Sequence, residues 1–179
     1  MLEGEYDICL ADPPWRFASN SEAKPGKNAF GHYDCMKVAE VAALPVKDMM
    51  AKDALLLLWT TAPFLMEAAK VIDAWGFKYK TNIVWDKQRI ATGYWVRGEH
   101  EHLLICRRGK FPTPDPAFRR GSMIRGGRRE HSRKPDDIHE WVNTAWPAAR
   151  KVEMFARERR QGWTAWGNET TKFGTNEDA

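Results

Sequence analysis

Apolar residues along this chain gather in short runs that end in polar or glycine-rich turns, which is the pattern of buried strands. One such run, YDICLA, ends at Asp12, where Asp-Pro-Pro begins. Another, ALLLLWT, has no polar face and is typical of a strand covered on both sides of a parallel sheet. Strands are predicted at Tyr6–Ala11, Ala54–Thr60, Phe77–Trp85, Glu101–Arg107, Lys151–Ala156 and Gly162–Trp166.

Segments with helical spacing of apolar residues separate these strands. Met36–Met50 has this spacing, and Pro45 is expected to divide its helix into two short pieces. A further helix is predicted at Pro63–Trp75, closed by Gly76, and another begins at Pro135, because proline suits the first helical position. Strands that alternate with helices predict an α/β sheet with helices on both faces.

Composition excludes several classes of protein. With 43% hydrophobic residues the chain can bury a core, and its length suits one domain over residues 1–179. Its longest apolar stretch, Ala54–Trp59, is far shorter than the roughly 20 residues that span a bilayer. No secretory signal is recognisable, so a cytoplasmic protein without membrane contact is expected. Three widely spaced cysteines predict neither a disulfide framework nor structural zinc. Trp59, Trp85 and Trp146 are expected in the core.

Two polar segments are predicted to be loops. The first, from about 19 to 31, has little to bury and is expected to be mobile. The second, from about 108 to 133, is long and lacks periodicity. Between Arg107 and Lys134 the chain holds ten basic and two acidic residues, a net +8 in a protein of net charge +4. Clustered cations indicate a polyanionic partner, although a solvated surface loop is the alternative. The cations expected to contact nucleic acid phosphates are Arg125, Arg128 and Arg129.

The tetrapeptide Asp12-Pro13-Pro14-Trp15 directly follows a predicted strand, where open α/β sheets bind their ligands. An aromatic amine such as N6 of adenine is a poor nucleophile and needs acceptors aimed at its N–H groups. The Asp12 carboxylate and a carbonyl of the rigid proline pair supply acceptors, and Trp15 is expected to stack on the base. The structural alternative is a proline-rich turn with a core tryptophan.

Nine further segments accompany DPPW, namely HYDCM, LLLLW, WGF, IVW, TGYW, EH, SRKPD, EMFAR and WGNE, in this order between His32 and Glu169. With them, the chain from Tyr6 to Glu169 resembles the MT-A (seventy-kilodalton subunit) family of S-adenosylmethionine-dependent N6-adenine methyltransferases, of bacterial or phage type. The resemblance implies a Rossmann-like class I methyltransferase sheet in permuted order, with the catalytic DPPW loop before the cofactor-binding C-terminal strand. This order agrees with the absence from the sequence of a glycine-rich dinucleotide fingerprint and of a P-loop.

The resemblance also implies roles for individual residues. The implied catalytic residues are Asp12, Pro13, Pro14 and Trp15. The implied ligands of S-adenosylmethionine are Asp12, Lys134, Arg157, Asn168 and Glu169. The residues implied to line the pocket for the acceptor adenosine are Tyr33 and Glu101.

Several alternatives stay open on sequence alone. DNA is favoured over RNA as the substrate because the chain resembles a bare catalytic domain without the zinc fingers of eukaryotic RNA-modifying relatives. A non-catalytic, nucleic-acid-binding member of the family is a second possibility, and a phosphoryl transferase is disfavoured by the missing phosphate loop. His100 and His102 flank Glu101 without a third ligand at a recognised spacing, so no metal is predicted. Both a monomer and a homodimer are compatible with the sequence.

Overall fold

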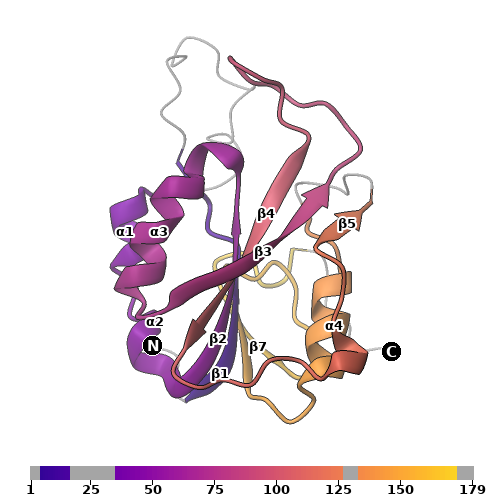
Figure 1. Ribbon diagram of the computed structural model, residues 1–179. Coiled ribbons are helices and arrows are strands. Elements are labelled where there is room, and N and C mark those ends of the chain that lie inside the picture. Colours follow the sequence, from indigo (N-terminus) through magenta and orange to yellow (C-terminus); the bar gives the residue numbers. More distant parts are fainter. Residues whose placement is uncertain (1–4, 17–34, 127–132, 173–179) are drawn as a thin grey trace.

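A seven-stranded sheet organises the computed structural model, which describes residues 5–16, 35–126 and 133–172 (Figure 1). Its strands are β1 (Tyr6–Ala11), β2 (Met50–Thr60), β3 (Lys78–Asp86), β4 (His100–Arg108), β5 (Met123–Arg125), β6 (Lys151–Met154) and β7 (Trp163–Trp166). Each of the six runs predicted as strands lies in this sheet, so those predictions are confirmed. The mobile loop predicted at about 19 to 31 lies outside the described residues.

Strand direction places one end of nearly every strand at the same edge. The order across the sheet is β5-β3-β4-β2-β1-β6-β7. β1 pairs in parallel with β2 on one side and with β6 on the other, and β7 runs parallel to β6. β4 is antiparallel to β2 and to β3, and β5 is parallel to β3. The carboxyl ends of all these strands except β4 therefore share one edge, here called the carboxyl edge. The chain leaves β1 toward β2 and later returns on its other side, so a ligand crevice is expected beside the end of β1.

Helices cover both faces of the sheet. α1 (Val38–Ala42), α2 (Val46–Met49) and α3 (Leu65–Ala74) lie on one face, and α4 (Asp137–Ala145) lies on the other (Figure 1). Pro45 separates α1 from α2, and Gly76 follows α3 with a φ of 80°, a conformation that glycine adopts without a steric penalty. The prediction of an α/β sheet with two covered faces is confirmed.

Each face of the sheet has its own apolar core. Side chains alternate along β2, so that Leu56 and Leu58 join the core under α1 and α3, whereas Leu57 and Trp59 join the core under α4. This double burial explains why ALLLLWT has no polar face. Trp59 and Trp85 are each 1% exposed, which confirms their predicted place in the core. Trp146 is partly buried and packs against the same cluster.

Three element boundaries differ from the sequence predictions. β2 begins at Met50, four residues early, because Met50 pairs with Tyr6 of β1 although the segment between contains polar residues. β6 ends at Met154 because Phe155 has a φ of 63°, which breaks the extended backbone. α4 begins at Asp137 rather than at Pro135. In each case backbone pairing or a local dihedral angle, not hydrophobic patterning, decides the boundary.

The segment predicted as a loop from about 108 to 133 is packed against the protein in its described part. Phe111 is 6% exposed and contacts Trp146, with 5.6 Å between ring centroids. The short strand β5 pairs with β3, and its Ile124 is 4% exposed. The prediction of one uninterrupted loop is therefore wrong, because single apolar residues too widely spaced to form a pattern still anchor the chain.

Candidate active site

The turn after β1 lies at the carboxyl edge, between the ends of β2 and β6. The Asp12 backbone N–H donates to the Met154 carbonyl of β6 at 3.4 Å. The Pro13 carbonyl accepts from the N–H of Trp15 at 2.9 Å, and the Pro14 carbonyl accepts from the N–H of Met36 at 2.8 Å. Each proline carbonyl thus has one partner and retains a second lone pair. Because proline fixes φ, these contacts hold Asp12 and both carbonyls in a rigid turn.

Trp15 supports this turn from below. Its side chain is buried, at 6% exposure, and its indole Nε1–H donates to the Trp59 carbonyl at 3.1 Å. Its ring stacks on Phe64, with centroids 5.4 Å apart and planes 19° apart. The ring therefore packs in the core instead of offering a face to a base, and the prediction that Trp15 stacks on the substrate is not supported by this arrangement.

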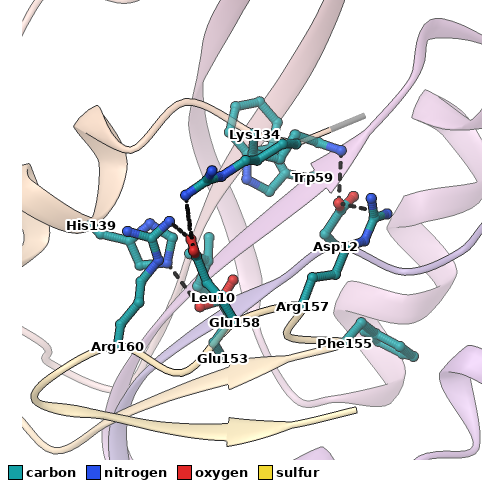
Figure 2. Close-up of a pocket in the computed structure, with 11 residues that line it drawn as sticks. Leu10, Asp12, Trp59, Lys134, His139, Glu153, Phe155, Arg157, Glu158 and Arg160 are labelled. Atoms are coloured by element: carbon teal, nitrogen blue, oxygen red, sulfur yellow. Dashed lines mark hydrogen bonds and ion pairs between the residues drawn. The ribbon is translucent and has the colours of Figure 1, made fainter. Parts of the chain in front are cut away.

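A chain of ion pairs joins Asp12 to residues far away in the sequence. Lys134 Nζ donates to Asp12 Oδ2 at 2.7 Å and lies 3.3 Å from Glu101 Oε2 (Figure 2). Lys87 Nζ donates to the other Glu101 oxygen, Oε1, at 3.2 Å. Only 14% of the Lys134 side chain and 10% of the Glu101 side chain are exposed. Lys134 therefore connects the turn after β1 to the start of β4 within a largely buried cluster.

Burial and charge act in opposite directions on this cluster. Burial by itself raises the pKa of the Glu101 carboxyl, but the ammonium groups of Lys134 and Lys87 outweigh it and hold that pKa below its usual value. Burial by itself lowers the pKa of Lys134, and the carboxylates of Asp12 and Glu101 outweigh it, so that pKa is raised. Both groups are therefore charged at neutral pH, and each stabilises the other.

Arg157 links the turn after β1 to the end of β7. Its Nη2 lies 3.8 Å from Asp12 Oδ2, and its Nε lies 3.8 Å from Glu169 Oε2. Gly167 makes this approach possible, because a Cβ atom there would lie 3.0 Å from both the N and the O of Ala156. The structure thus brings together four of the sequence-predicted cofactor ligands. Asn168, the fifth, is exposed on the same turn.

A second group of charged residues lines the pocket beside Lys134, on the side of α4 (Figure 2). Arg133 donates to both carboxylate oxygens of Glu158, at 2.9 and 3.2 Å, and Arg160 also pairs with Glu158. His139 Nε2 lies 2.9 Å from Glu153 Oε2. Sequence reasoning did not select these residues. A usable signal existed only for Glu153, which is a charged residue inside the otherwise apolar centre of a strand.

The remaining predicted site residues are less closely tied to this pocket. Arg125 is exposed at the end of β5, also on the carboxyl edge. Tyr33, Arg128 and Arg129 lie outside the described residues. In the same basic segment, Arg120 pairs with Asp137 at 3.8 Å. Together with Arg133 and Lys134, it shows that part of the +8 segment neutralises carboxylates within the protein.

His100 and His102 contact one another edge to face, with ring centroids 4.9 Å apart. Burial and the neighbouring His100 lower the pKa of His102. Among residues 5–16, 35–126 and 133–172, no group of three or more His, Cys, Asp or Glu side chains is placed to hold a metal ion. Within the same ranges no helix is long and apolar enough to cross a membrane.

Comparisons with known proteins agree with this arrangement. The family model MT-A70 matches residues 6–169. The Type II methyltransferase M.MunI of a Mycoplasma species is 32% identical over 92% of this chain and 78% of its own length. An N(6)-adenosine-methyltransferase MT-A70-like protein of Arabidopsis thaliana is 30% identical over 93% of this chain, and the human N(6)-adenosine-methyltransferase catalytic subunit METTL3 is 26% identical over 93%. The chain spans only 24% and 28% of the lengths of these two eukaryotic relatives. The chain therefore belongs to the MT-A70 family, whose members use S-adenosylmethionine as the methyl donor.

Proposed function

We propose that this protein transfers a methyl group from S-adenosylmethionine to the N6 amino group of adenine in nucleic acid, with DNA as the favoured substrate. The observation that carries the proposal is the placement of Asp12. Its ion pairs with Lys134 and Arg157 both involve Oδ2. Among the described residues, Oδ1 is thus the oxygen with lone pairs available to an incoming N–H group. A carboxylate held in this way on a rigid turn suits an amine that must be oriented before it reacts.

The side chains around Asp12 fit the polar groups of the methyl donor. S-adenosylmethionine supplies a methyl group on positively charged sulfur. Its amino-acid end carries an ammonium and a carboxylate, which complement Asp12 and Lys134 respectively. Its ribose carries two hydroxyls, which Arg157 and Glu169 can bind as donor and acceptor. These four side chains already converge at the end of β1, so we assign cofactor binding to them together with Asn168.

The acceptor side of the site offers hydrogen-bond acceptors in fixed positions. Asp12 Oδ1 accepts one N–H of the adenine amino group, and the free lone pair of a proline carbonyl, Pro13 or Pro14, accepts the other. As the nitrogen becomes tetrahedral its N–H bonds become more acidic, so these acceptors bind the transition state more tightly than the ground state. Glu101 and Tyr33 are assigned to the adenosine pocket. Trp15 acts beneath the turn as a positioning residue.

Two relatives support the choice of atom and of polymer. The Arabidopsis and human proteins are named as N(6)-adenosine methyltransferases, which supports N6 as the atom that receives the methyl group. The Mycoplasma protein is a Type II methyltransferase that is similar over most of its own length, which favours the bacterial type and DNA. The exposed cations of the basic segment, Arg125, Arg128 and Arg129, are assigned to phosphate contacts.

The decisive assay measures radiolabelled methyl transfer from S-adenosylmethionine to matched single- and double-stranded DNA and RNA, followed by nucleoside analysis. We expect N6-methyladenine in DNA from the wild-type protein and a loss of at least about 100-fold in Asp12→Asn. The matched control is Asp73→Asn, the same chemical change on an exposed residue of α3. Nucleic acid binding without methyl transfer by the wild type would instead establish a non-catalytic member of the family.

A further inference from the structure

The connection between β3 and β4 carries the most exposed aromatic side chains among the described residues. Tyr94 is 96% exposed, Trp95 is 98% exposed and Val96 is 81% exposed, with Ile90 at 53% behind them. These four residues are here called the aromatic tip. Large apolar side chains this exposed are uncommon in water-soluble surfaces and mark places where something binds. Neither the proposed chemistry nor the cofactor site makes use of them.

The backbone of this connection is built to present the aromatic tip. Lys87 N–H donates to the Glu99 carbonyl and Ala91 N–H to the Gly98 carbonyl, each at 2.9 Å, so the two sides of the connection are tied together. The Arg97 side chain also donates to the Ala91 carbonyl at 3.0 Å. At Gly93 a Cβ atom would lie 1.9 Å from the Val96 carbonyl oxygen, so only glycine permits this tight turn. Tyr94 and Trp95 project from a cross-linked turn and lose little freedom on binding.

Charge and position indicate what the aromatic tip binds. From Lys87 to Gly98 the chain has three cations, Lys87, Arg89 and Arg97, and no acidic residue. The connection extends beyond the carboxyl edge of the sheet, the edge that carries Asp12 and the exposed Arg125 (Figure 1). A two-fold contact between copies through this turn would bring these cations against their own counterparts, which is unfavourable. Flat rings flanked by cations beside the site of base modification instead suit a polyanion with accessible bases.

We propose that Tyr94 and Trp95 form a stacking platform for unpaired bases of the nucleic acid substrate next to the base that enters the active site. The inference rests on the proposed function in that the partner is nucleic acid. Stacking of a base on an aromatic ring tolerates any sequence, because every base has a π face. Arg89 and Arg97 contact the phosphates on either side. The aromatic tip thus holds the strand, while the turn after β1 reacts with it.

The test is equilibrium binding of an end-labelled single-stranded oligodeoxynucleotide, and of the matched duplex, measured by fluorescence anisotropy at one salt concentration. Loss of one stacked base weakens binding by about 5- to 150-fold, so we expect Trp95→Ala and Tyr94→Ala to raise the single-strand Kd within that range. Trp95→Phe keeps a flat ring and recovers most of the affinity. The matched control is Tyr79→Ala, which removes a half-exposed aromatic ring from the opposite end of β3.

Several outcomes would overturn the inference. Single-strand affinity unchanged in both alanine variants does so, as does a loss confined to the duplex. Sedimentation that shows a wild-type dimer and a Trp95→Ala monomer assigns the tip to a second copy of the chain. The proposed function is judged separately, by whether the wild type forms N6-methyladenine. A wild type that methylates adenine, beside a Trp95→Ala variant with unchanged binding, refutes the stacking platform alone.

Discussion

Charged and apolar side chains exchange their usual places in two neighbouring regions of the carboxyl edge. In the cluster around Asp12, charged side chains are withdrawn from water, with only 10% of the Glu101 and 14% of the Lys134 side chain exposed. At the aromatic tip, Tyr94 and Trp95 are almost fully exposed. Buried charges are costly unless each has a partner, and the cluster supplies those partners within the protein. Exposed rings are unsatisfied until a ligand covers them. The first region is organised before substrate arrives, and the second depends on substrate for its burial.

The largest effect is expected from breaking the buried cluster at Lys134. Lys134→Met leaves Asp12 and Glu101 without their shared cation, so unfolding free energy should fall by about 3–5 kcal/mol and methyl transfer by at least about 100-fold. Chemical denaturation and radiolabelled methyl transfer measure the two effects. Lys134→Arg retains the charge and should keep most of the stability. Lys70→Met, on an exposed helix position, is the matched control, and equal losses in the two methionine variants would contradict the role of the cluster.

The cluster also predicts a pH dependence. The pKa of Glu101 is lowered in the folded protein, so its stabilisation is present above the unfolded pKa of about 4.3 and is lost as pH falls through the folded value. The pKa of Lys134 is raised, so its stabilisation is present below about 10.4 and is lost as pH rises through the folded value. The stability difference between wild type and Glu101→Gln should therefore be constant from about pH 5 to 10.

Urea denaturation of both proteins across this range tests the window. At neutral pH the difference should be about 1.5–3 kcal/mol, the range for a hydrogen bond to a charged group. It should shrink below about pH 4, where Glu101 takes up a proton. A difference that grows on acidification would show that Glu101 is destabilising in the folded protein. Glu67→Gln, an exposed glutamate in an ion pair with Lys70, should give no such window.

A smaller and salt-dependent effect is expected from the basic segment. Exposed cations that contact phosphates displace counterions, so Arg125→Ala, Arg128→Ala and Arg129→Ala together should reduce the slope of log affinity against log salt by about 2 to 3 on duplex DNA. Affinity measured at several salt concentrations gives this slope. The exposed Lys80 at the far end of β3 is the control site, and Lys80→Ala should leave the slope unchanged. An unaltered slope in the triple variant would rule out phosphate contacts by these arginines.

The smallest effect is expected where charge is both paired and exposed. Glu67 and Lys70 lie 2.7 Å apart on α3, with 44% and 67% of their side chains exposed. Water screens this pair, so Glu67→Ala should change the unfolding free energy by about 0.5 kcal/mol or less. A loss comparable to that of Lys134→Met would show that burial does not separate the two kinds of ion pair.

Sequence patterns predicted the elements of this fold better than their ends. Continuous apolar runs identified the strands because burial on both faces leaves no room for polar residues. Pro45 and Gly76 marked helix ends because their backbone restrictions are local. The start of β2 at Met50 and the short strand β5 were missed, since each depends on pairing with a strand that no local pattern identifies.

Part of the candidate site was also accessible from sequence. The DPPW motif and its companion segments selected Asp12, Lys134, Arg157 and Glu169, and the structure brings these four together. Lys87 and Glu158 were missed because their roles arise only from contact with Glu101 and Arg133. The stacking role expected of Trp15 came from its chemistry alone, and packing against Phe64 decides its actual surroundings.

The sequence by itself determined the α/β class, the family resemblance and the turn that carries Asp12, because each is encoded in residues adjacent along the chain. Only the tertiary structure decided which cations face carboxylates inside the protein and which face solvent. Lys134 and Asp12 are separated by 122 positions, and they meet because β1 lies beside β2 at the edge where β4 begins. Composition counts all cations alike. Burial and pairing distinguish Lys134, which organises the site, from Arg125, which remains available to a partner.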